Sequence, residues 1–260
     1  MDKLFVVKIG GEIIDDELRL NQFLKNFSVI KEKKILVHGG GVVANNLLSD
    51  LGVKENFHNG RRITDVETLK VVTMVYAGLI NKKIVASLQS KNINAIGLTG
   101  ADAKIISAKK RINNEVDFGF VGDISSINSS QIENFLQNGL TPILAPITSD
   151  STGQLLNTNA DTIAGEIAIA MSKNYSVELI YSFGKKGVLQ NIEDENSVLK
   201  SLNFENFNLL KNENKIFSGM LPKLENCFNA IKNGVSKVII GDATELDLLI
   251  LQKAGTEIVA

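Results

Sequence analysis

Two glycine-rich turns are the parts of this sequence best suited to chemistry. The first is Lys-Ile-Gly-Gly at residues 8–11, after the apolar run 4–7, and the second is His-Gly-Gly-Gly at 38–41, after 34–37. Each pattern is typical of a buried strand that ends in a tight turn and opens into a helix. The backbone N–H groups of such a turn approach an anion closely, because no Cβ intervenes and a helix N-terminus carries partial positive charge. With a lysine ahead of the first glycine pair, the turns predict a phosphate site in a nucleotide-dependent transferase.

Further charged and amide side chains stand at predicted strand ends or helix starts, where open α/β sheets bind ligands. They are Lys8, Arg62, Asn157, Asn159, Asp161 and Lys223. Lys223 follows Pro222, a residue favoured in the first turn of a helix, so its cation meets the positive end of the helix dipole. A bound anion would reverse that penalty, and a solvated surface lysine is the alternative.

The other candidates have structural alternatives of their own. Asn157 or Asn159 alone could be no more than a helix cap. Arg61, beside Arg62, is interpreted as a surface charge. Lys8 has the weakest structural alternative, because a charged group at the exit of a buried strand needs a partner.

Several other chemistries lack their motifs. The sequence contains no G-x-x-x-x-G-K-[ST] and no G-x-G-x-x-G after a predicted strand. His-Gly-Gly-Gly also occurs as an oxyanion element of α/β-hydrolases, but their G-x-S-x-G nucleophile elbow is absent. The two histidines, His38 and His58, have no cluster of Cys or His partners, which argues against a transition-metal site. We predict that His38 is a hydrogen-bonded residue at a strand end.

The elements that position these groups alternate strand and helix in the first part of the chain. Buried strands are predicted at 3–9 and 34–37, with an amphipathic helix over 16–31 between them and another helix at 42–51. A strand–helix–strand unit at this spacing predicts a parallel sheet. The expected fold is therefore α/β, with an open, mainly parallel central sheet and helices on both faces.

A long helix is predicted over residues 65–90. It is apolar nearly all round between Val71 and Ile80, so it is expected to be buried on every side. A small domain rarely buries so long a helix completely. A homodimer interface and a central core helix are equally good interpretations.

The rest of the chain is more varied. A hairpin excursion is predicted over 103–128 and polar, Asn-rich loops over 190–215. The other predicted elements are strands at 95–100, 141–147, 177–181, 237–240 and 256–259, and helices at 130–138, 160–173, 219–233 and 245–253. A composition shift near residue 174 predicts two lobes of one continuous sheet, 1–174 and 175–260.

Bulk composition excludes several classes of protein. Apolar residues make up 44% and charged residues 22% of the 260, as in ordinary globular proteins. The net charge of −1 argues against a nucleic-acid partner, because no basic excess exists to neutralise a phosphate backbone. A single cysteine, Cys227, fits a reducing compartment. With neither a signal-peptide core nor an apolar run near the length of a membrane span, we expect a cytoplasmic protein without a membrane partner.

Five segments in order resemble the amino acid kinase family, and within it the branch that acts on N-acetylglutamate. They are residues 8–11, 38–41, Asn-Gly-Arg-Arg-Ile-Thr at 59–64, Asn-Thr-Asn-Ala-Asp at 157–161, and Lys223. Each motif alone is weak, but five with the right gaps are specific. The pattern Asn-Gly-x-Arg-[Ile/Val]-Thr is what favours the acetylglutamate branch.

The resemblance implies a reaction and roles for the residues. ATP, with Mg²⁺ bridging its phosphates, would phosphorylate the side-chain carboxylate of N-acetyl-L-glutamate, the second step of arginine biosynthesis. Lys8 and Lys223 would neutralise the moving phosphoryl group, and Asp161 would hold the two lysines. By the same resemblance Gly10 and Gly11 cradle the ATP phosphates, Gly40 and Gly41 the attacking carboxylate, and Arg62, Asn157 and Asn159 the substrate's α-carboxylate end.

The nucleotide lobe departs from the family pattern. Family members carry an aspartate in a T-D-V-x-G-V type segment, and here residues 182–189 read Ser-Phe-Gly-Lys-Lys-Gly-Val-Leu. The nucleotide contacts implied by the resemblance are Gly184, Lys185, Lys186, Gly187, Lys215 and Phe217, and either lysine of the 182–189 segment could approach the ATP phosphates directly.

Other functions stay open at this point. The acyl group could be longer, for example succinyl, and glutamate 5-kinase or another acyl-phosphate-forming relative is a further possibility. A degenerate kinase kept as a sensor is less consistent with the presence of Lys8, Asp161 and Lys223. Arginine-inhibited members carry an extra helix that builds a hexamer, whereas only Met1 and Asp2 precede the first strand here. We therefore expect an arginine-insensitive homodimer.

Overall fold

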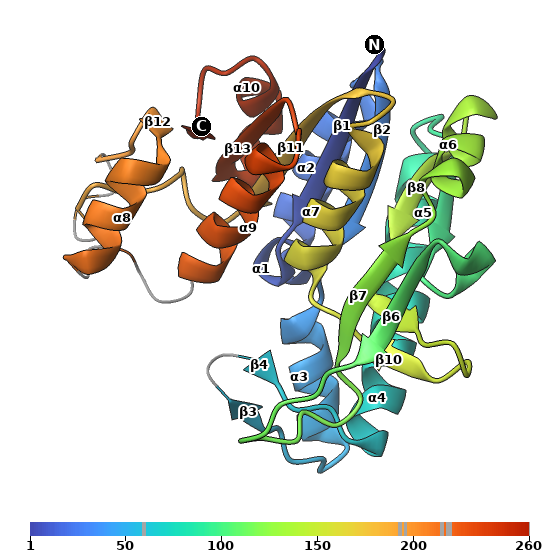
Figure 1. The fold of residues 1–260 in the computed structure, drawn as a ribbon. Helices are drawn as coiled ribbons and strands as arrows, with labels where there is room; N and C mark the ends of the chain where they lie inside the picture. Colours follow the sequence, from blue (N-terminus) through green and yellow to red (C-terminus); the bar gives the residue numbers. More distant parts are fainter. Residues whose placement is uncertain (59–60, 192–193, 195–196, 214–215, 217–219, 260) are drawn as a thin grey trace.

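The computed structural model describes the chain except for residues 59–60, 192–193, 195–196, 214–215, 217–219 and 260. Within the described residues, eight strands form a central sheet (Figure 1). In sheet order they are β12 (Ser201–Leu202), β14 (Thr256–Ile258), β13 (Lys237–Asp242), β11 (Ser176–Phe183), β1 (Lys3–Ile9), β2 (Lys33–His38), β8 (Thr141–Leu144) and β5 (Ala95–Leu98). Neighbours from β13 to β5 are parallel, and β14 is antiparallel to β13. The predicted mainly parallel α/β fold is confirmed.

Strand β1 lies in the middle of the sheet, and its side chains divide the core into two layers. Successive side chains of a strand point to opposite faces. Leu4 and Val6 pack in the layer on one face, whereas Phe5, Val7 and Ile9 pack in the layer on the other. Both faces of β1 are therefore covered, as its continuous apolar sequence predicts.

Helices cover both faces of the sheet. One layer contains residues from α6 (Ser129–Gln137), α7 (Ala160–Met171), α8 (Phe204–Asn212) and α9 (Leu221–Lys232). The other contains residues from α1 (Gly11–Asp15), α2 (Glu17–Ser28), α3 (Gly41–Asp50), α4 (Val66–Thr73), α5 (Asn81–Gln89) and α10 (Leu246–Ile250). Single 3₁₀ turns occupy Asp102–Lys104 and Ala243–Glu245.

Two smaller sheets lie beside the central one. The first has the order β10 (Leu155–Asn157), β9 (Ile147–Ser149), β6 (Ile106–Lys110), β7 (Gly122–Ile127), and the second pairs β3 (Phe57–His58) with β4 (Arg61–Arg62). Strands β6 and β7 are antiparallel, so the predicted hairpin excursion is confirmed.

The predicted strand 141–147 is wrong in its extent. The chain leaves the central sheet after β8 and enters the second sheet at β9. Pro146 stands between these two strands, and a proline cannot donate to a sheet ladder.

The stretch 190–215, predicted as loops, contains β12 and the helix α8. The side chain of Asn203 caps α8 by accepting a hydrogen bond from the backbone N–H of Asn206. Phe207 is buried, with its ring centroid 5.0 Å from that of Phe228 on α9. A polar, Asn-rich composition concealed this short amphipathic helix.

The long helix predicted over 65–90 is present, but it is not buried on every side. Segments α4 and α5 continue into one another through a π-helical segment, Met74–Ile80. Met74 is 57% exposed and Leu79 59% exposed, so part of its apolar surface faces solvent. By length and composition alone Val66–Gln89 could cross a membrane, which our sequence analysis did not anticipate. In the most apolar 18-residue stretch of this helix, 44% of the residues are buried inside the protein. The core helix of a globular protein can meet the same criteria of length and composition.

His38, at the end of β2, is a hydrogen-bonded strand-end residue, as predicted. Its buried ring is held between the Gly39 carbonyl oxygen, 2.8 Å from Nδ1, and the Asn81 side-chain amide nitrogen, 3.1 Å from Nε2. This network assigns the neutral tautomer, in which Nδ1–H donates and Nε2 accepts. Burial lowers the pKa of His38 to about 4, against the hydrogen bond to Gly39, and the charge of Lys82 lowers it further.

The His38 environment predicts a loss of stability in mild acid. The unfolded chain protonates this histidine below pH 6.5 and the folded chain only near pH 4, so the folded state loses stability as pH falls through this window. The loss attributable to His38 is about 3 kcal/mol at most. In urea unfolding, His38→Gln should be less stable than the wild type at neutral pH, by a margin that shrinks towards pH 4.

The matched control is His58→Gln, which removes the other histidine of the chain, at a half-buried position. A His38→Gln margin that stays constant with pH would show that the buried imidazole is not the titrating group.

Candidate active site

The two glycine turns meet at the carboxyl ends of β1 and β2, beside a cavity of about 960 Å³. The N–H of Gly39 donates to the carbonyl of Ile9 over 3.1 Å, which ties one turn to the other. A Cβ added to Gly11 would lie 3.4 Å from the backbone nitrogen of Gly41. The turns are thus in van der Waals contact, and the backbones of Gly11 and Gly41 both line the cavity.

Gly40 is required by its backbone and by its neighbours. Its φ of +153° is rarely adopted by residues with a side chain. A Cβ at this position would collide with the Ile80 side chain and lie 2.9 Å from the ring of Tyr76. Both neighbours belong to the π-helical segment, so the long helix supports the second glycine turn directly.

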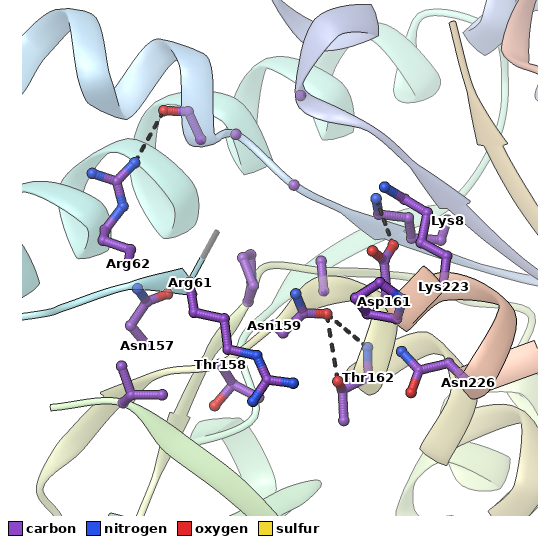
Figure 2. A pocket seen from close by; sticks show the side chains of 18 of the residues that line it. Lys8, Arg61, Arg62, Asn157, Thr158, Asn159, Asp161, Thr162, Lys223 and Asn226 are labelled. Atoms are coloured by element: carbon purple, nitrogen blue, oxygen red, sulfur yellow. Dashed lines mark hydrogen bonds and ion pairs between the residues drawn. The ribbon is translucent and has the colours of Figure 1, made fainter. Parts of the chain in front are cut away.

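Lys8 enters the cavity because of the alternation along β1. It lies two residues after Val6 and so on the same sheet face, the face that α7 covers. Its Nζ lies 2.6 Å from Oδ1 of Asp161, in the first turn of α7 (Figure 2). The side chains are 9% and 13% exposed, so this is a largely buried ion pair.

A second lysine lies near the same carboxylate. Lys223, in the first turn of α9, lies beside Asp161 in Figure 2, with its Nζ 5.7 Å from the centroid of the Phe183 ring. Burial opposes ionisation of Asp161, but the charges of Lys8 and Lys223 outweigh it and lower the pKa of this carboxyl below its usual value. Asp161 is therefore an anion paired with Lys8 and close to the positive charge of Lys223.

Arg62 lies on the opposite side of the cavity. Its guanidinium packs on the ring of Phe57, 4.9 Å from the centroid, and its Nη2 donates to the side-chain oxygen of Asn45 and, over 3.4 Å, to the carbonyl of Gly41. Its Nη1 lies 3.6 Å from Glu55 and, among the described residues, is buried without a hydrogen-bond partner. A planar cation with a buried donor to spare is suited to a carboxylate ligand.

Both asparagines lie just before the start of α7. Asn157 ends β10, and its side-chain nitrogen donates to the hydroxyl of Thr64 over 3.0 Å. The side-chain oxygen of Asn159 caps α7 by accepting from the N–H of Thr162 over 3.0 Å, so only its amide nitrogen is left to serve a ligand. Asn159 thus performs the capping role that was its structural alternative, while still lining the cavity.

The cavity brings together most, but not all, of the residues singled out in the sequence. Its lining includes Lys8, Gly11, Gly40, Gly41, Arg62, Asn157, Asn159, Asp161 and Lys223. Gly10, Gly184, Lys185, Lys186 and Gly187 do not line it. Lys215 and Phe217 lie outside the described residues.

Apart from Gly10, which follows β1, the described residues that do not line the cavity follow the neighbouring strand β11. A Cβ on Gly184 would contact Glu12 and Arg19, and Gly187, with a φ of +159°, packs against Thr256 and Val198. The N–H of Gly10 donates to the carbonyl of Ser182 over 3.2 Å, so this loop begins beside the first glycine turn.

Sequence reasoning missed several cavity residues. Arg61 is exposed, in agreement with its interpretation as a surface charge, but it also lines the cavity, as do Tyr76, Arg111 and Asn226. Tyr76 is buried, and burial raises the pKa of its hydroxyl, against the nearby positive charge of Arg62. Only Arg61 had a usable signal in the sequence, because it neighbours Arg62 in the same polar segment; Arg62 itself was selected by its position and by the family resemblance.

The comparisons with known proteins agree with this geometry. The model of the amino acid kinase family matches residues 3–242. The chain belongs to the amino acid kinase family. The family resemblance inferred from the five segments is therefore confirmed.

Within this family, curated relatives match over nearly their whole length. The chain is 51% identical to an acetylglutamate kinase of Cytophaga hutchinsonii, with 100% of each chain covered. It is also 51% identical to an acetylglutamate kinase of Bacteroides fragilis, with 92% of each covered. Among solved structures it is similar to smu.665 from Streptococcus mutans UA159, with a TM-score of 0.83, 29% identity, and 100% and 99% of the two chains covered.

The Lys8–Asp161 pair predicts a large cost for removing its carboxylate. Asp161→Asn leaves Lys8 without a counter-ion in a buried position, so the free energy of unfolding should fall by about 3–5 kcal/mol in urea denaturation at neutral pH. The matched control is Asp123→Asn, whose carboxylate pairs with Arg111 and is 53% exposed. Exposed pairs contribute at most about 1 kcal/mol. Equal losses in the two variants would contradict a buried pair at the centre of the site.

Proposed function

We propose that this protein is an ATP-dependent kinase that phosphorylates the side-chain carboxylate of N-acetyl-L-glutamate, giving N-acetyl-L-glutamyl 5-phosphate and ADP in arginine biosynthesis. The observation that carries the proposal is the Lys8–Asp161–Lys223 cluster at the contact between the two glycine turns. Support for the substrate comes from relatives named acetylglutamate kinase at 51% identity over nearly the full chain.

The chemistry requires little more than charge and alignment. A carboxylate is already a nucleophile at neutral pH, so no general base is needed, and the neutral, buried His38 has no part in the transfer. The obstacle is that an anion attacks a polyanion, and the site must supply positive charge and in-line geometry. Lys8 and Lys223 are the two cations at the point where the turns meet, and they neutralise the phosphoryl group as it moves.

Asp161 has a positioning role in this proposal. Two lysines with like charge repel each other, and the carboxylate beside them offsets this repulsion and keeps both ammonium groups at the transfer point. The pKa of Asp161 lies below its usual value, so the carboxylate keeps its charge at neutral pH. The cluster carries a net positive charge when all three groups are ionised, and it therefore still attracts a phosphate.

The acceptor occupies the side of the cavity lined by Gly40, Gly41 and Arg62. The spare buried donor of Arg62 binds the α-carboxylate of the amino acid, assisted by Asn157 and Asn159. The γ-carboxylate then points to the glycine turns, between Lys8 and the backbone of Gly41.

The nucleotide lies toward the C-terminal lobe, residues 175–260, and the acceptor toward residues 1–174. The phosphates of the nucleotide would contact Gly10 and Gly11. The other nucleotide contacts would come from Gly184, Lys185, Lys186, Gly187, Lys215 and Phe217.

Among the described residues no group of three or more His, Cys, Asp or Glu side chains is arranged to hold a metal ion. This donor set does not suit a resident cation, and Mg²⁺ in the proposal is carried by the ATP phosphates.

The compartment and the assembly are also part of the proposal. Cys227 is a free, buried thiol, which supports a reducing compartment such as the cytoplasm. The exposed apolar side chains Met74 and Leu79 on the long helix support a homodimer.

The decisive experiment is an ATP-dependent hydroxamate assay, which traps acyl phosphates, with N-acetylglutamate, glutamate and aspartate side by side. We expect acyl phosphate from N-acetylglutamate and none from the free amino acids. Activity on free glutamate alone would favour a glutamate 5-kinase, and ATP binding without any acyl phosphate would favour a sensor.

Arg62→Lys should raise the KM for the acylated amino acid about 10- to 100-fold with little change in the KM for ATP. Lysine cannot replace a bidentate guanidinium, and one charge-assisted hydrogen bond contributes about 1.5–3 kcal/mol. The matched control is Arg111→Lys, at another arginine of the cavity lining whose charge is paired with Asp123. A change in the KM for ATP instead would place Arg62 in the nucleotide site.

Leu79→Asp should convert the dimer into a monomer in light scattering, because it places a charge on the exposed apolar side of the long helix. The control is Leu18→Asp on α2, where the leucine is 82% exposed. A wild-type protein that is already monomeric, or dimers that persist in Leu79→Asp, would refute this interface.

A further inference from the structure

Arg61 is a cavity cation that the proposed reaction does not use. It is adjacent to Arg62 in the two-residue strand β4, and adjacent strand residues point to opposite sides. Figure 2 shows the consequence: Arg62 is directed towards α3, whereas Arg61 reaches into the cavity towards the loop that carries Thr158 and Asn159. The two neighbouring arginines thus approach a ligand from different directions.

Three of the other cations of the cavity lining form ion pairs with carboxylates. Lys8 pairs with Asp161, Arg62 lies 3.6 Å from Glu55, and Arg111 holds Asp123 through three contacts. Lys223 lies near Asp161, whose pKa its charge lowers, and the side chain of Arg61 is exposed. Among the described residues, no carboxylate forms an ion pair with Arg61. Glu225 also lines the cavity, but its carboxylate is 3.0 Å from Lys211 and so is already paired.

N-acetylglutamate leaves Arg61 without a partner. The acceptor has two carboxylates: the γ-carboxylate lies at the glycine turns and the α-carboxylate at Arg62. Its third substituent, the acetyl group, is uncharged and offers only a methyl group and a carbonyl oxygen. A guanidinium facing into a cavity is the usual recognition element for a carboxylate or phosphate.

The position of Arg61 favours the acceptor over the nucleotide as its partner. It belongs to the same hairpin as Arg62, whereas Lys223 and Asn226 reach the cavity from α9 of the C-terminal lobe (Figure 2).

We propose that Arg61 binds a carboxylate on the acyl group, and that the preferred acceptor is an N-acylglutamate whose acyl group itself ends in a carboxylate. Succinyl is the simplest group of this class that keeps a flexible two-carbon spacer. The inference rests on the proposed function and deepens it: the reaction at the γ-carboxylate is the same, and the acyl end supplies the selectivity. N-acetylglutamate remains a substrate, because its two carboxylate contacts do not involve Arg61.

The test measures kcat/KM of the full chain for N-succinyl-L-glutamate and N-acetyl-L-glutamate at saturating ATP, together with the KM for ATP. The wild type should prefer the succinyl compound. In Arg61→Gln the ratio of the two kcat/KM values, succinyl over acetyl, should fall about 10- to 100-fold, the effect of one charge-assisted hydrogen bond. Arg61→Lys should recover part of the ratio because it restores the charge.

The matched control is Lys31→Gln, which removes one exposed positive charge ahead of β2, at the opposite end of the sheet from the cavity. It should leave the ratio unchanged, which separates a local contact from the net charge of the molecule. Each substrate also serves as the folding control for the other, since both are measured on the same preparation.

Two results would overturn the inference. One is a wild type that prefers N-acetylglutamate with a ratio that Arg61→Gln does not change. The other is an Arg61→Gln variant in which the KM for ATP rises and both acceptors lose activity equally, which would assign Arg61 to the nucleotide. If the wild type phosphorylates neither acylated compound, the proposed function itself fails, and this result is distinct from the other two.

Discussion

The Lys8–Asp161 ion pair is the interaction on which the rest of this structure depends. Lys8 is the penultimate residue of a strand that is buried from Leu4 onward, so its ammonium group is stable only with a partner. Asp161 can be that partner because α7 covers the face of β1 that carries Val6 and begins near the carboxyl end of this strand. The pair therefore forms only if β1 points Lys8 to the face that α7 covers and α7 begins beside it. Lys223 on α9 must also lie close to the pair. A buried pair of this kind adds little net stability, and its presence is better explained by the charge that it positions.

The glycine turns show a second form of the same constraint. A phosphate and a carboxylate must approach each other closely, so the backbones that hold them must also be close. The Gly11 backbone is near that of Gly41, and Gly40 has no room for a side chain against Ile80 and Tyr76. The long helix thus performs two tasks, because its buried face supports the turn at Gly40 while its exposed face carries Met74 and Leu79.

The sequence predicted those parts of the fold in which local pattern and tertiary environment agree. Continuous apolar runs identified β1, β2 and β11, and the cavity collects the polar residues that follow the strand ends. The predictions from sequence failed where a single residue changed the course of the chain or where burial depended on neighbouring elements. Pro146 moves the chain from one sheet to another, and α8 is concealed by a polar composition in which Phe207 carries most of the burial. The exposure of Leu79 depends on how the long helix sits against its neighbours, which no periodicity along the chain determines.

Arg61 shows why site residues are harder to predict than strands. Residue type does not separate it from Arg62, since both are arginines in one polar segment. The strand geometry separates them: one side chain turns back onto Phe57 and α3, and the other turns into the cavity. Because the two residues of β4 point to opposite sides, its two arginines can contact a ligand from two directions. Because the reacting carboxylate and the α-carboxylate are common to every N-acylglutamate, only a group that faces the acyl end can distinguish one substrate from another. A cation in that direction selects by charge, and for that reason it discriminates more strongly than a change of pocket size by one or two methylene groups.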